Sequence, residues 1–252
     1  MAEILSLEEH ATDVAHNVRR KLEAYSPQLW LARNLKEPIR FEALGTAVLL
    51  KFGSSKFLVT AGHTFGDRKH DAGKIGLAFG DHFYTLPTTS WFYDNKGTST
   101  SSKLDLSVCK LDKDLILSIE KKYRFLDVSD IEQNHNLLLE KRYLLYGYPL
   151  GWSQSRGENL PPKPKYFSYL TTPTINNLGE HIHLKFKKEK FDPEPRGMSG
   201  SGLWYIPKFE NSNIKFPLKL IGIMISWEAL HSRVTATRID YVMQIIRQHF
   251  QS

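Results

Sequence analysis

Cysteine and long apolar runs are the two features that this sequence has least of. Cys109 is the only cysteine among 252 residues, so no disulfide can form within the chain, and we expect a reducing compartment. No window approaches the roughly 18 consecutive apolar residues of a membrane span. The first residues also lack the basic start and apolar run of a secretory signal. The sequence therefore predicts a cytoplasmic protein with no membrane segment.

A strongly one-sided charge is also absent. The chain has 34 Lys and Arg against 27 Asp and Glu, a formal net charge of +7, and this balance alone could favour an anionic partner. The densest basic stretch, HIHLKFKKEK at 181–190, alternates Ile182, Leu184 and Phe186 with polar residues, as a strand with one buried and one solvated face does. We therefore expect the lysines to cover an outer face, and we do not expect a nucleic-acid partner.

After Pro38 the sequence is rich in short runs of β-branched and aromatic residues. Clusters of Gly, Pro, Asn and Ser separate these runs, and little helical periodicity lies between them. The runs are GTAVLLKF, KFLVTA, KIGLAF, DLSVCKL, RYLLYGYP, HIHLKFK, SGLWYI and LKLIGIMISW. Many short strands with few helices favour an all-β fold built from barrels or a sandwich.

Three segments depart from this β pattern. Residues 6–25 carry apolar residues at helical spacing, with Ser6 and Glu9 as a capping box, which predicts an amphipathic opening helix. Residues 112–141 are helical or irregular and are the expected linker between two β units. Residues 238–250 predict a closing helix packed on the second unit. The apolar face of that helix is Ile239, Val242, Ile245, Ile246 and Phe250.

The candidate nucleophile is a serine in a glycine-rich turn, PRGMSGSGLWY at 195–205. Small residues around Ser199 let the backbone curl, so that the amides of Gly197 and Ser199 can converge on one carbonyl oxygen as an oxyanion hole. Taken alone, the motif is equally consistent with a plain serine–glycine turn between strands. The nucleophile elbow of α/β-hydrolases is excluded, because Ser201 stands where that motif needs glycine and the chain lacks alternating strands and helices.

Three motifs in order, LVTAGH, LDLSVCKL and GMSGSG, resemble the histidine, aspartate and serine motifs of the chymotrypsin-like (trypsin-like) serine peptidases. The intervals between His63, Asp105 and Ser199 are 42 residues (105 − 63) and 94 residues (199 − 105), against about 45 and 93 in the type triad of that family. The runs GTAVLLKF, LLYGYPLG and LIGIMISWE resemble further strands of the family, so the similarity covers about residues 40–250.

The resemblance implies a fold of two six-stranded antiparallel β-barrels of the chymotrypsin-like type, with an added N-terminal helix and a C-terminal helix. Its domain limits are a helical extension at 1–36, a first barrel at 37–115, a linker at 116–140, and a second barrel with the closing helix at 141–252. Residues 1–36 have no counterpart in the family pattern.

The resemblance also assigns catalytic roles. Ser199 would attack an acyl carbon, and His63 would take its proton and return it to the leaving amine. Asp105 would hold the imidazole in the right tautomer and stabilise its charged form. Asp94 and Asp112 are rivals for this third role, but only Asp105 opens an apolar strand as the family's aspartate does.

The sequence departs from the family pattern beside these residues. Met198 precedes the serine, where secreted members that are activated by cleavage carry an aspartate, so such activation is not expected. Glu228 replaces a small residue and could narrow or acidify the pocket, and Pro193 stands between Asp192 and Glu194, so a preference for basic substrate side chains is open. The substrate-binding positions that the family implies are Pro193, Ser226, Trp227 and Glu228.

Histidine pairs and the cysteine are weaker candidates for a site. His181 with His183, or His70 with His82, lacks a nearby cysteine or carboxylate pair at zinc spacing, so we expect no metal site and no cofactor. Cys109 lies on an apolar strand, and we expect a buried small hydrophobic residue with no reactive thiol.

Two functions remain open at this point. The first is a serine endopeptidase that hydrolyses peptide bonds of a protein or peptide substrate through an acyl-enzyme. The second is a catalytically silent or conditionally active peptidase-like domain that binds proteins. The opening helix is a candidate docking surface for a regulatory protein partner, and packing of that helix against its own barrel is the alternative.

Overall fold

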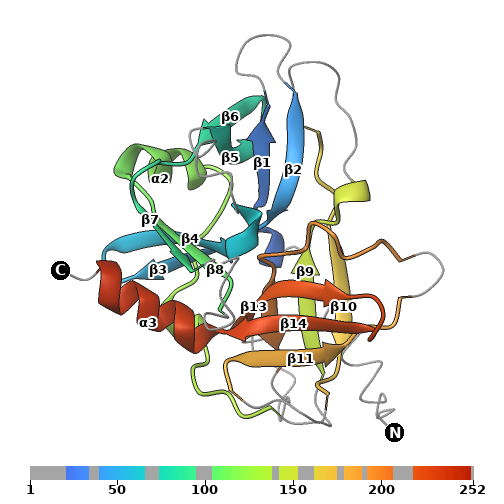
Figure 1. The fold of residues 1–252 in the computed structure, drawn as a ribbon. Coiled ribbons are helices and arrows are strands. Elements are labelled where there is room, and N and C mark those ends of the chain that lie inside the picture. Colours follow the sequence, from blue (N-terminus) through green and yellow to red (C-terminus); the bar gives the residue numbers. More distant parts are fainter. Residues whose placement is uncertain are drawn as a thin grey trace, which may run out of the picture.

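The computed structural model describes residues 21–33, 40–65, 74–94, 104–137, 142–152, 162–174, 179–188, 192–206 and 218–250. The strands of these residues pair antiparallel in three sheets of four, six and four strands, and a helix follows the last strand (Figure 1). This architecture confirms the all-β class and the C-terminal helix. Within these ranges, none of the helices has the length and the apolar character that crossing a bilayer requires.

The N-terminal region differs from the helical extension that the sequence predicts. The helix expected at 6–25, with its docking surface, lies largely outside the described residues, although residues 21–23 are helical and Leu22 is buried. The prediction of a helical extension to residue 36 is wrong at Gln28–Ala32, which form strand β1. All five residues of β1 are buried, because the strand pairs with β2 on one edge and with β5 on the other. This pairing outweighs the helix propensity of the Leu and Ala residues in the segment.

The first half of the protein contains two four-stranded sheets, with the strand orders β2-β1-β5-β6 and β3-β4-β8-β7. Only Ala47 separates β2 from β3, so one run of chain passes from the first sheet into the second. Leu29 of β1 and Leu58 of β4 belong to one buried cluster, so the two sheets share a core. The remaining strands are β2 Phe41–Thr46, β3 Val48–Phe52, β4 Ser55–Ala61, β5 Ile75–Phe79, β6 His82–Thr85, β7 Trp91–Asp94 and β8 Leu106–Lys110.

The second half contains one six-stranded sheet with the order β10-β9-β12-β13-β14-β11. Its two edge strands are bonded to each other just beyond the end of β10. There the N–H of Thr174 donates to the carbonyl of His183 at 2.8 Å, and the N–H of Lys185 donates to the carbonyl of Thr172 at 2.9 Å. The strands are β9 Tyr143–Gly147, β10 Phe167–Thr171, β11 His181–Lys185, β12 Gly202–Tyr205, β13 Lys219–Glu228 and β14 Arg233–Arg238.

The segment between the halves is helical and irregular, as the sequence predicts. Helix α2 spans Lys113–Ile119, and the short turn η3 spans Val128–Asp130. Asp112 is the N-cap of α2, because its Oδ1 accepts a hydrogen bond from the N–H of Leu115 at 2.8 Å. Leu115 itself is buried in the cluster that the first two sheets share.

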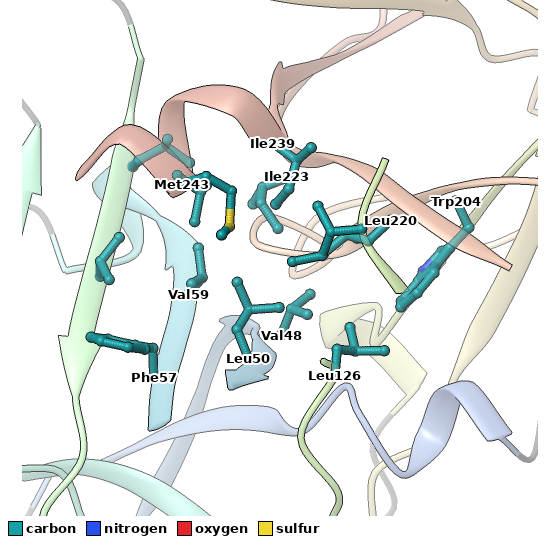
Figure 2. Close-up of a cluster of buried hydrophobic side chains, with 14 of the residues drawn as sticks. Val48, Leu50, Phe57, Val59, Leu126, Trp204, Leu220, Ile223, Ile239 and Met243 are labelled. Atoms are coloured by element: carbon teal, nitrogen blue, oxygen red, sulfur yellow. The ribbon is translucent and has the colours of Figure 1, made fainter. Parts of the chain in front are cut away.

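The two halves are joined by a common hydrophobic core, shown in Figure 2. Residues from β3 and β4, residues from β12 and β13, and helix α3 (Ile239–Phe250) all contribute to it. The labelled members are Val48, Leu50, Phe57, Val59, Leu126, Trp204, Leu220, Ile223, Ile239 and Met243. Because densely packed interiors deform little, side chains that meet between the halves are held in fixed relative positions.

Candidate active site

His63 lies in a short helical turn, η1 (Gly62–Thr64), directly after strand β4. β3 and β8 pair with the two edges of β4 and so fix the position of η1. A side chain at position 62 would place its Cβ 2.9 Å from Oδ1 of Asp105. Glycine at this position therefore lets the backbone of His63 approach the Asp105 carboxylate.

Asp105 directly precedes β8 and has a positive φ of 48°. Aspartate adopts this left-handed conformation more readily than most residues. The turn lets the Asp105 carbonyl accept from the N–H of Gly62 at 2.7 Å, while Oδ1 accepts from the N–H of His63 at 2.7 Å. Asp105 is thus tied to η1 through two backbone amides, whereas the carboxylate of its rival Asp112 is occupied as the cap of α2.

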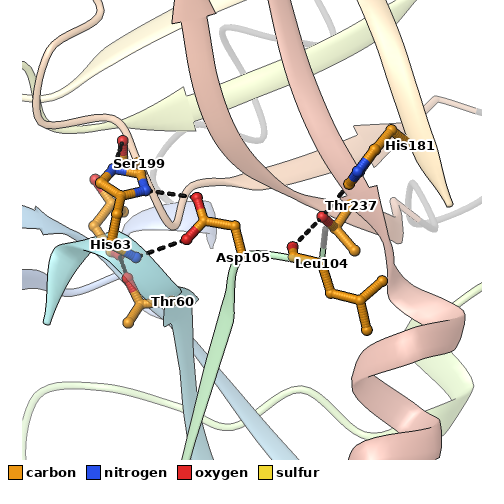
Figure 3. Close-up of polar contacts among 8 residues, drawn as sticks. Thr60, His63, Leu104, Asp105, His181, Ser199 and Thr237 are labelled. Atoms are coloured by element: carbon orange, nitrogen blue, oxygen red, sulfur yellow. Dashed lines mark hydrogen bonds and ion pairs between the residues drawn. The ribbon is translucent and has the colours of Figure 1, made fainter. Parts of the chain in front are cut away.

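The structure brings together the three residues that the motifs single out (Figure 3). Nδ1 of His63 lies 2.6 Å from Oδ2 of Asp105, and Nε2 of His63 lies 2.9 Å from Oγ of Ser199. A carboxylate can only accept, so Nδ1 carries the imidazole proton and Nε2 presents a lone pair to the Ser199 hydroxyl. A nucleophile, a base and a group that orients the base are therefore connected in one hydrogen-bonded path.

Ser199 lies in the loop 195–201, whose carbonyl groups are held from both halves of the protein. The carbonyl of Arg196 accepts from the N–H of Leu150, in the turn η4 (Leu150–Trp152), at 2.8 Å, and the carbonyl of Ser199 accepts from the N–H of Thr46 at 2.8 Å. The C=O and N–H of a planar trans peptide point in opposite directions. Fixing the Arg196 carbonyl on Leu150 therefore turns the N–H of Gly197 away from Leu150, and Gly197 itself has a φ of 88° that favours glycine.

Between Gly197 and Ser201, two amide N–H groups have no acceptor among the described residues. The other amides donate to carbonyls at 2.9, 2.8 and 2.7 Å: Met198 to Pro195, Ser201 to Met198 and Gly200 to Met224. Within the described part of the chain, neither Gly197 nor Ser199 donates its N–H to an acceptor. These are the two donors that the sequence predicts for an oxyanion hole. Folded proteins rarely leave buried amides unpaired, and these two N–H groups can donate to an oxygen atom bound beside Ser199.

A cleft of about 530 Å³ opens beside Ser199. Ser226 and Trp227, two of the four residues predicted to bind substrate, line it. Its walls are His63, Asp105, Pro195, Arg196, Ser199, Met224, Ile225, Ser226, Trp227 and Ala229.

The other two predicted substrate-binding residues, Pro193 and Glu228, do not line this cleft. Pro193 is buried. Nη2 of Arg233 lies 2.7 Å from each oxygen of Glu228, and Nδ1 of His231 lies 3.0 Å from one of them. Donation by Arg233 lowers the pKa of Glu228, so the carboxylate is charged but compensated. Glu228 therefore adds no uncompensated negative charge to this cleft.

Arg196 is a cleft residue that sequence reasoning missed. Its side chain is 76% exposed, and its Nε lies 3.5 Å from Glu194. The residue precedes the predicted oxyanion glycine, Gly197, and that adjacency is the signal that could have found it. The cleft thus contains a guanidinium group, paired with Glu194, whereas the sequence left a preference for basic substrate side chains open.

The remaining candidates have structural partners. Nδ1 of His183 lies 3.1 Å from Oγ1 of Thr235, and burial lowers the pKa of this histidine. Nδ1 of His181 lies 3.2 Å from Oγ1 of Thr237. His70 falls outside the described residues, and the described ones contain no group of three His, Cys, Asp or Glu that could hold a metal ion.

Cys109 is fully buried, as predicted from its apolar strand, and burial raises the pKa of its thiol well above the usual range. It lies on β8, in the core that the first two sheets share. A thiol that stays protonated and out of contact with solvent is a poor nucleophile.

Comparisons with known proteins add little to this geometry. No protein-family model matches the chain, and no curated protein matches it. Among solved structures, one reported under the words "Aromatic interactions drive the coupled folding and binding of the intrinsically disordered Sesbania mosaic virus VPg protein" is similar at 13% identity, with a TM-score of 0.48. That similarity covers 90% of this chain and 96% of the other. At this identity and score the similarity carries no argument about what the protein does.

Proposed function

We propose that this protein is a serine endopeptidase, with Ser199 as nucleophile, His63 as general base and Asp105 as the carboxylate that orients the base. One observation carries the proposal. A hydrogen-bonded path runs from Asp105 through His63 to Ser199 Oγ, with distances of 2.6 and 2.9 Å, beside two amides that have no acceptor among the described residues. A structural serine needs neither a base at its hydroxyl nor free amides next to it.

In the proposed reaction, Ser199 Oγ attacks the substrate carbonyl carbon while its proton moves to Nε2 of His63. The carbonyl oxygen becomes an oxyanion and accepts hydrogen bonds from the N–H groups of Gly197 and Ser199. Asp105 stabilises the imidazolium, which then gives its proton to the leaving amine as the C–N bond breaks. Water attacks the resulting ester by the same route, which releases the carboxylate product and restores the Ser199 hydroxyl.

We propose that the two halves are the two β-barrels that the family resemblance implies, with the site between them. The second half has the six strands that the resemblance implies, whereas the described residues of the first half form eight. In the second half, the bonds of Thr174 and Lys185 across the sheet edges support closure of the six strands. In the first half, the passage of β2 into β3 and the shared core of the two sheets support one closed unit. The segment 116–140 would then be the connection between the barrels.

The cleft suits an extended peptide with an apolar side chain next to the scissile bond. β13 pairs with β12 only as far as Ile223, whereas its pairing with β14 continues to Glu228. Within the described residues, no strand pairs with the other edge of 226–228, so a substrate backbone can add there as an antiparallel strand. Asp105 is the only carboxylate among the lining residues, and His63 occupies it. A lysine or arginine of the substrate would therefore meet Arg196 without a free anionic partner.

A cytoplasmic location remains part of the proposal. Its support is the single cysteine, which is buried and cannot form a disulfide within the chain.

Cleavage of a peptide library by the purified protein tests this function. We expect hydrolysis with a preference for apolar residues before the cut, and no hydrolysis by Ser199→Ala. Stoichiometric peptide binding by the wild type, with no cleavage, would contradict the endopeptidase proposal and support the binding-module alternative. Cleavage mainly after lysine or arginine would retain the mechanism but refute the proposed specificity.

A further inference from the structure

Thr46, the last residue of β2, contacts the loop that carries Ser199 through its side chain as well as its backbone. Its Oγ1 donates to the carbonyl of Gly197 at 3.1 Å, and the N–H of Tyr148 donates to the same Oγ1 at 3.0 Å. Its own carbonyl accepts from Oγ1 of Thr60 at 2.7 Å. Thr46 is fully buried. One hydroxyl therefore connects the first half of the protein, the residue that follows β9, and the candidate oxyanion loop.

We propose that Thr46 is a positioning residue, whose hydroxyl holds the Gly197 segment so that the amides of Gly197 and Ser199 face an incoming oxyanion. This inference rests on the proposed function. A hydroxyl has one proton to donate. The Tyr148 N–H occupies one lone pair, so the Thr46 proton is directed to the Gly197 carbonyl. Both contacts together define a single orientation of the Oγ1–H bond.

The loop needs this constraint because it contains Gly197, and glycine has the least restricted backbone of all residues. Gly197 has a φ of 88°, which only glycine adopts freely, and the same freedom lets its flanking peptides rotate. On one side, the Arg196 carbonyl is held by Leu150, and on the other side the Gly197 carbonyl is held by Thr46. Without the Thr46 hydroxyl, the Gly197–Met198 peptide would keep the bond from its N–H to Pro195, but no described residue would donate to its carbonyl.

The identity of residue 198 makes the constraint from the Thr46 hydroxyl more important. Met198 is fully buried and apolar, so it supplies no carboxylate that could pair with a cation and fix the loop. It belongs to the apolar cluster of the second sheet. The hydroxyl of Thr46 gives the loop a directional, polar constraint that apolar packing of Met198 cannot give.

Three variants separate positioning from general stabilisation. Thr46→Val keeps the shape and removes the hydroxyl, and Thr46→Ser keeps the hydroxyl. Thr171→Val removes a similarly buried hydroxyl, which donates to the carbonyl of Lys185 in the second sheet, outside the cleft lining. If Thr46→Val does not fold, Thr46→Ala replaces it with the same expected results.

We expect Thr46→Val to lower kcat for a cleaved peptide by about 10- to 100-fold, with KM unchanged within about twofold. The rate at which a fluorophosphonate labels Ser199 should fall by the same factor as kcat. Thr46→Ser should stay within about threefold of wild type because it retains the hydroxyl. Thr171→Val should lower the melting temperature without lowering kcat. Equal kcat in Thr46→Val and wild type, or an equal loss in Thr171→Val, would overturn the inference.

Crystal structures of the wild type and of Thr46→Val distinguish failure of this inference from failure of the proposed function. If the wild type neither cleaves peptides nor reacts with the fluorophosphonate, the proposed function fails. The two crystal structures then still test whether Thr46 holds the Gly197 carbonyl. A Gly197 carbonyl that turns away from position 46 in Thr46→Val supports the inference, and an unchanged loop overturns it.

Discussion

Replacing Asp105 with asparagine tests the assigned geometry most sharply, because the Asp105 carboxylate accepts two hydrogen bonds from one residue. Oδ1 accepts from the backbone N–H of His63 at 2.7 Å, and Oδ2 lies 2.6 Å from Nδ1 of the same residue. Asparagine has one oxygen and one NH2 group. If the NH2 faced the backbone N–H, two donors would oppose each other at that distance. The amide oxygen should therefore take the backbone N–H, and the NH2 should face Nδ1.

This orientation of the asparagine exchanges the donor and acceptor roles of the two imidazole nitrogens of His63. Nδ1 becomes an acceptor, so the ring proton moves to Nε2, where it points at Ser199 Oγ and prevents the base from accepting the serine proton. Loss of the correct tautomer in the type triad lowers kcat by about 10⁴-fold, which corresponds to about 5.4 kcal/mol of transition-state stabilisation. Both hydrogen bonds are retained, and only the one to Nδ1 changes direction, so the free energy of unfolding should change by only about 1 kcal/mol.

The assay is kcat and KM on a cleaved peptide, with thermal unfolding in parallel. Asp112→Asn is the matched control, since asparagine is also a good N-cap for α2, and it should keep both activity and stability. Asp105→Asn with activity near wild type, or Asp112→Asn without activity, would refute the assignment of the aspartate.

Three further predictions follow from backbone strain, burial and charge. Gly197→Ala should lower the free energy of unfolding by about 2–4 kcal/mol in urea titrations, because its Cβ would lie 2.7 Å from Cγ of Leu150 at a φ of 88°; an unchanged midpoint would contradict this. Cys109 should not react with an aromatic disulfide reagent until the protein is unfolded, because burial raises the pKa of its thiol; rapid reaction of folded protein would be the contrary result. Arg233 lowers the pKa of Glu228 in the folded protein. The contribution of this ion pair to the free energy of unfolding is therefore fully present above the ordinary pKa of 4.5, and it is lost as the pH falls through the lowered pKa of the folded protein. The melting temperatures of wild type and Glu228→Gln should therefore converge as the pH falls below 4.5, and a constant difference would contradict the ion pair.

The three motifs of the candidate site could be found in the sequence because each of them fixes residue type, order and local backbone together. His63, Asp105 and Ser199 each lie within three residues of a strand whose apolar pattern is visible in the sequence, and the structure contains all three strands. The closing helix was equally clear, since its buried face repeats at helical spacing. Packing of these elements in one core then brings together residues that lie far apart in the chain.

The features that the sequence did not predict depend on contacts with residues far away in the chain, which the local sequence does not show. Residues 28–32 were predicted to belong to a helical extension, but they form strand β1 because they pair with β2 and β5. Glu228 reads as a free acid, and its partner Arg233 faces it only because residues 219–228 and 233–238 pair as a hairpin. Thr46 is an ordinary strand residue in sequence, and its role appears only once the Ser199 loop lies against it.

Covalent labelling by a fluorophosphonate, read by intact mass and peptide mapping, tests the central claim most directly. Attack of Ser199 Oγ on phosphorus forms the O–P bond, expels fluoride and passes the hydroxyl proton to His63, while the phosphonyl oxygen would accept from the N–H groups of Gly197 and Ser199. We expect one label per chain, at Ser199, absent from Ser199→Ala and His63→Ala. Ser201→Ala should keep the label, because Ser201 is fully buried. Folded protein that stays unlabelled where a control serine peptidase reacts, or a label at any other residue, would contradict the account.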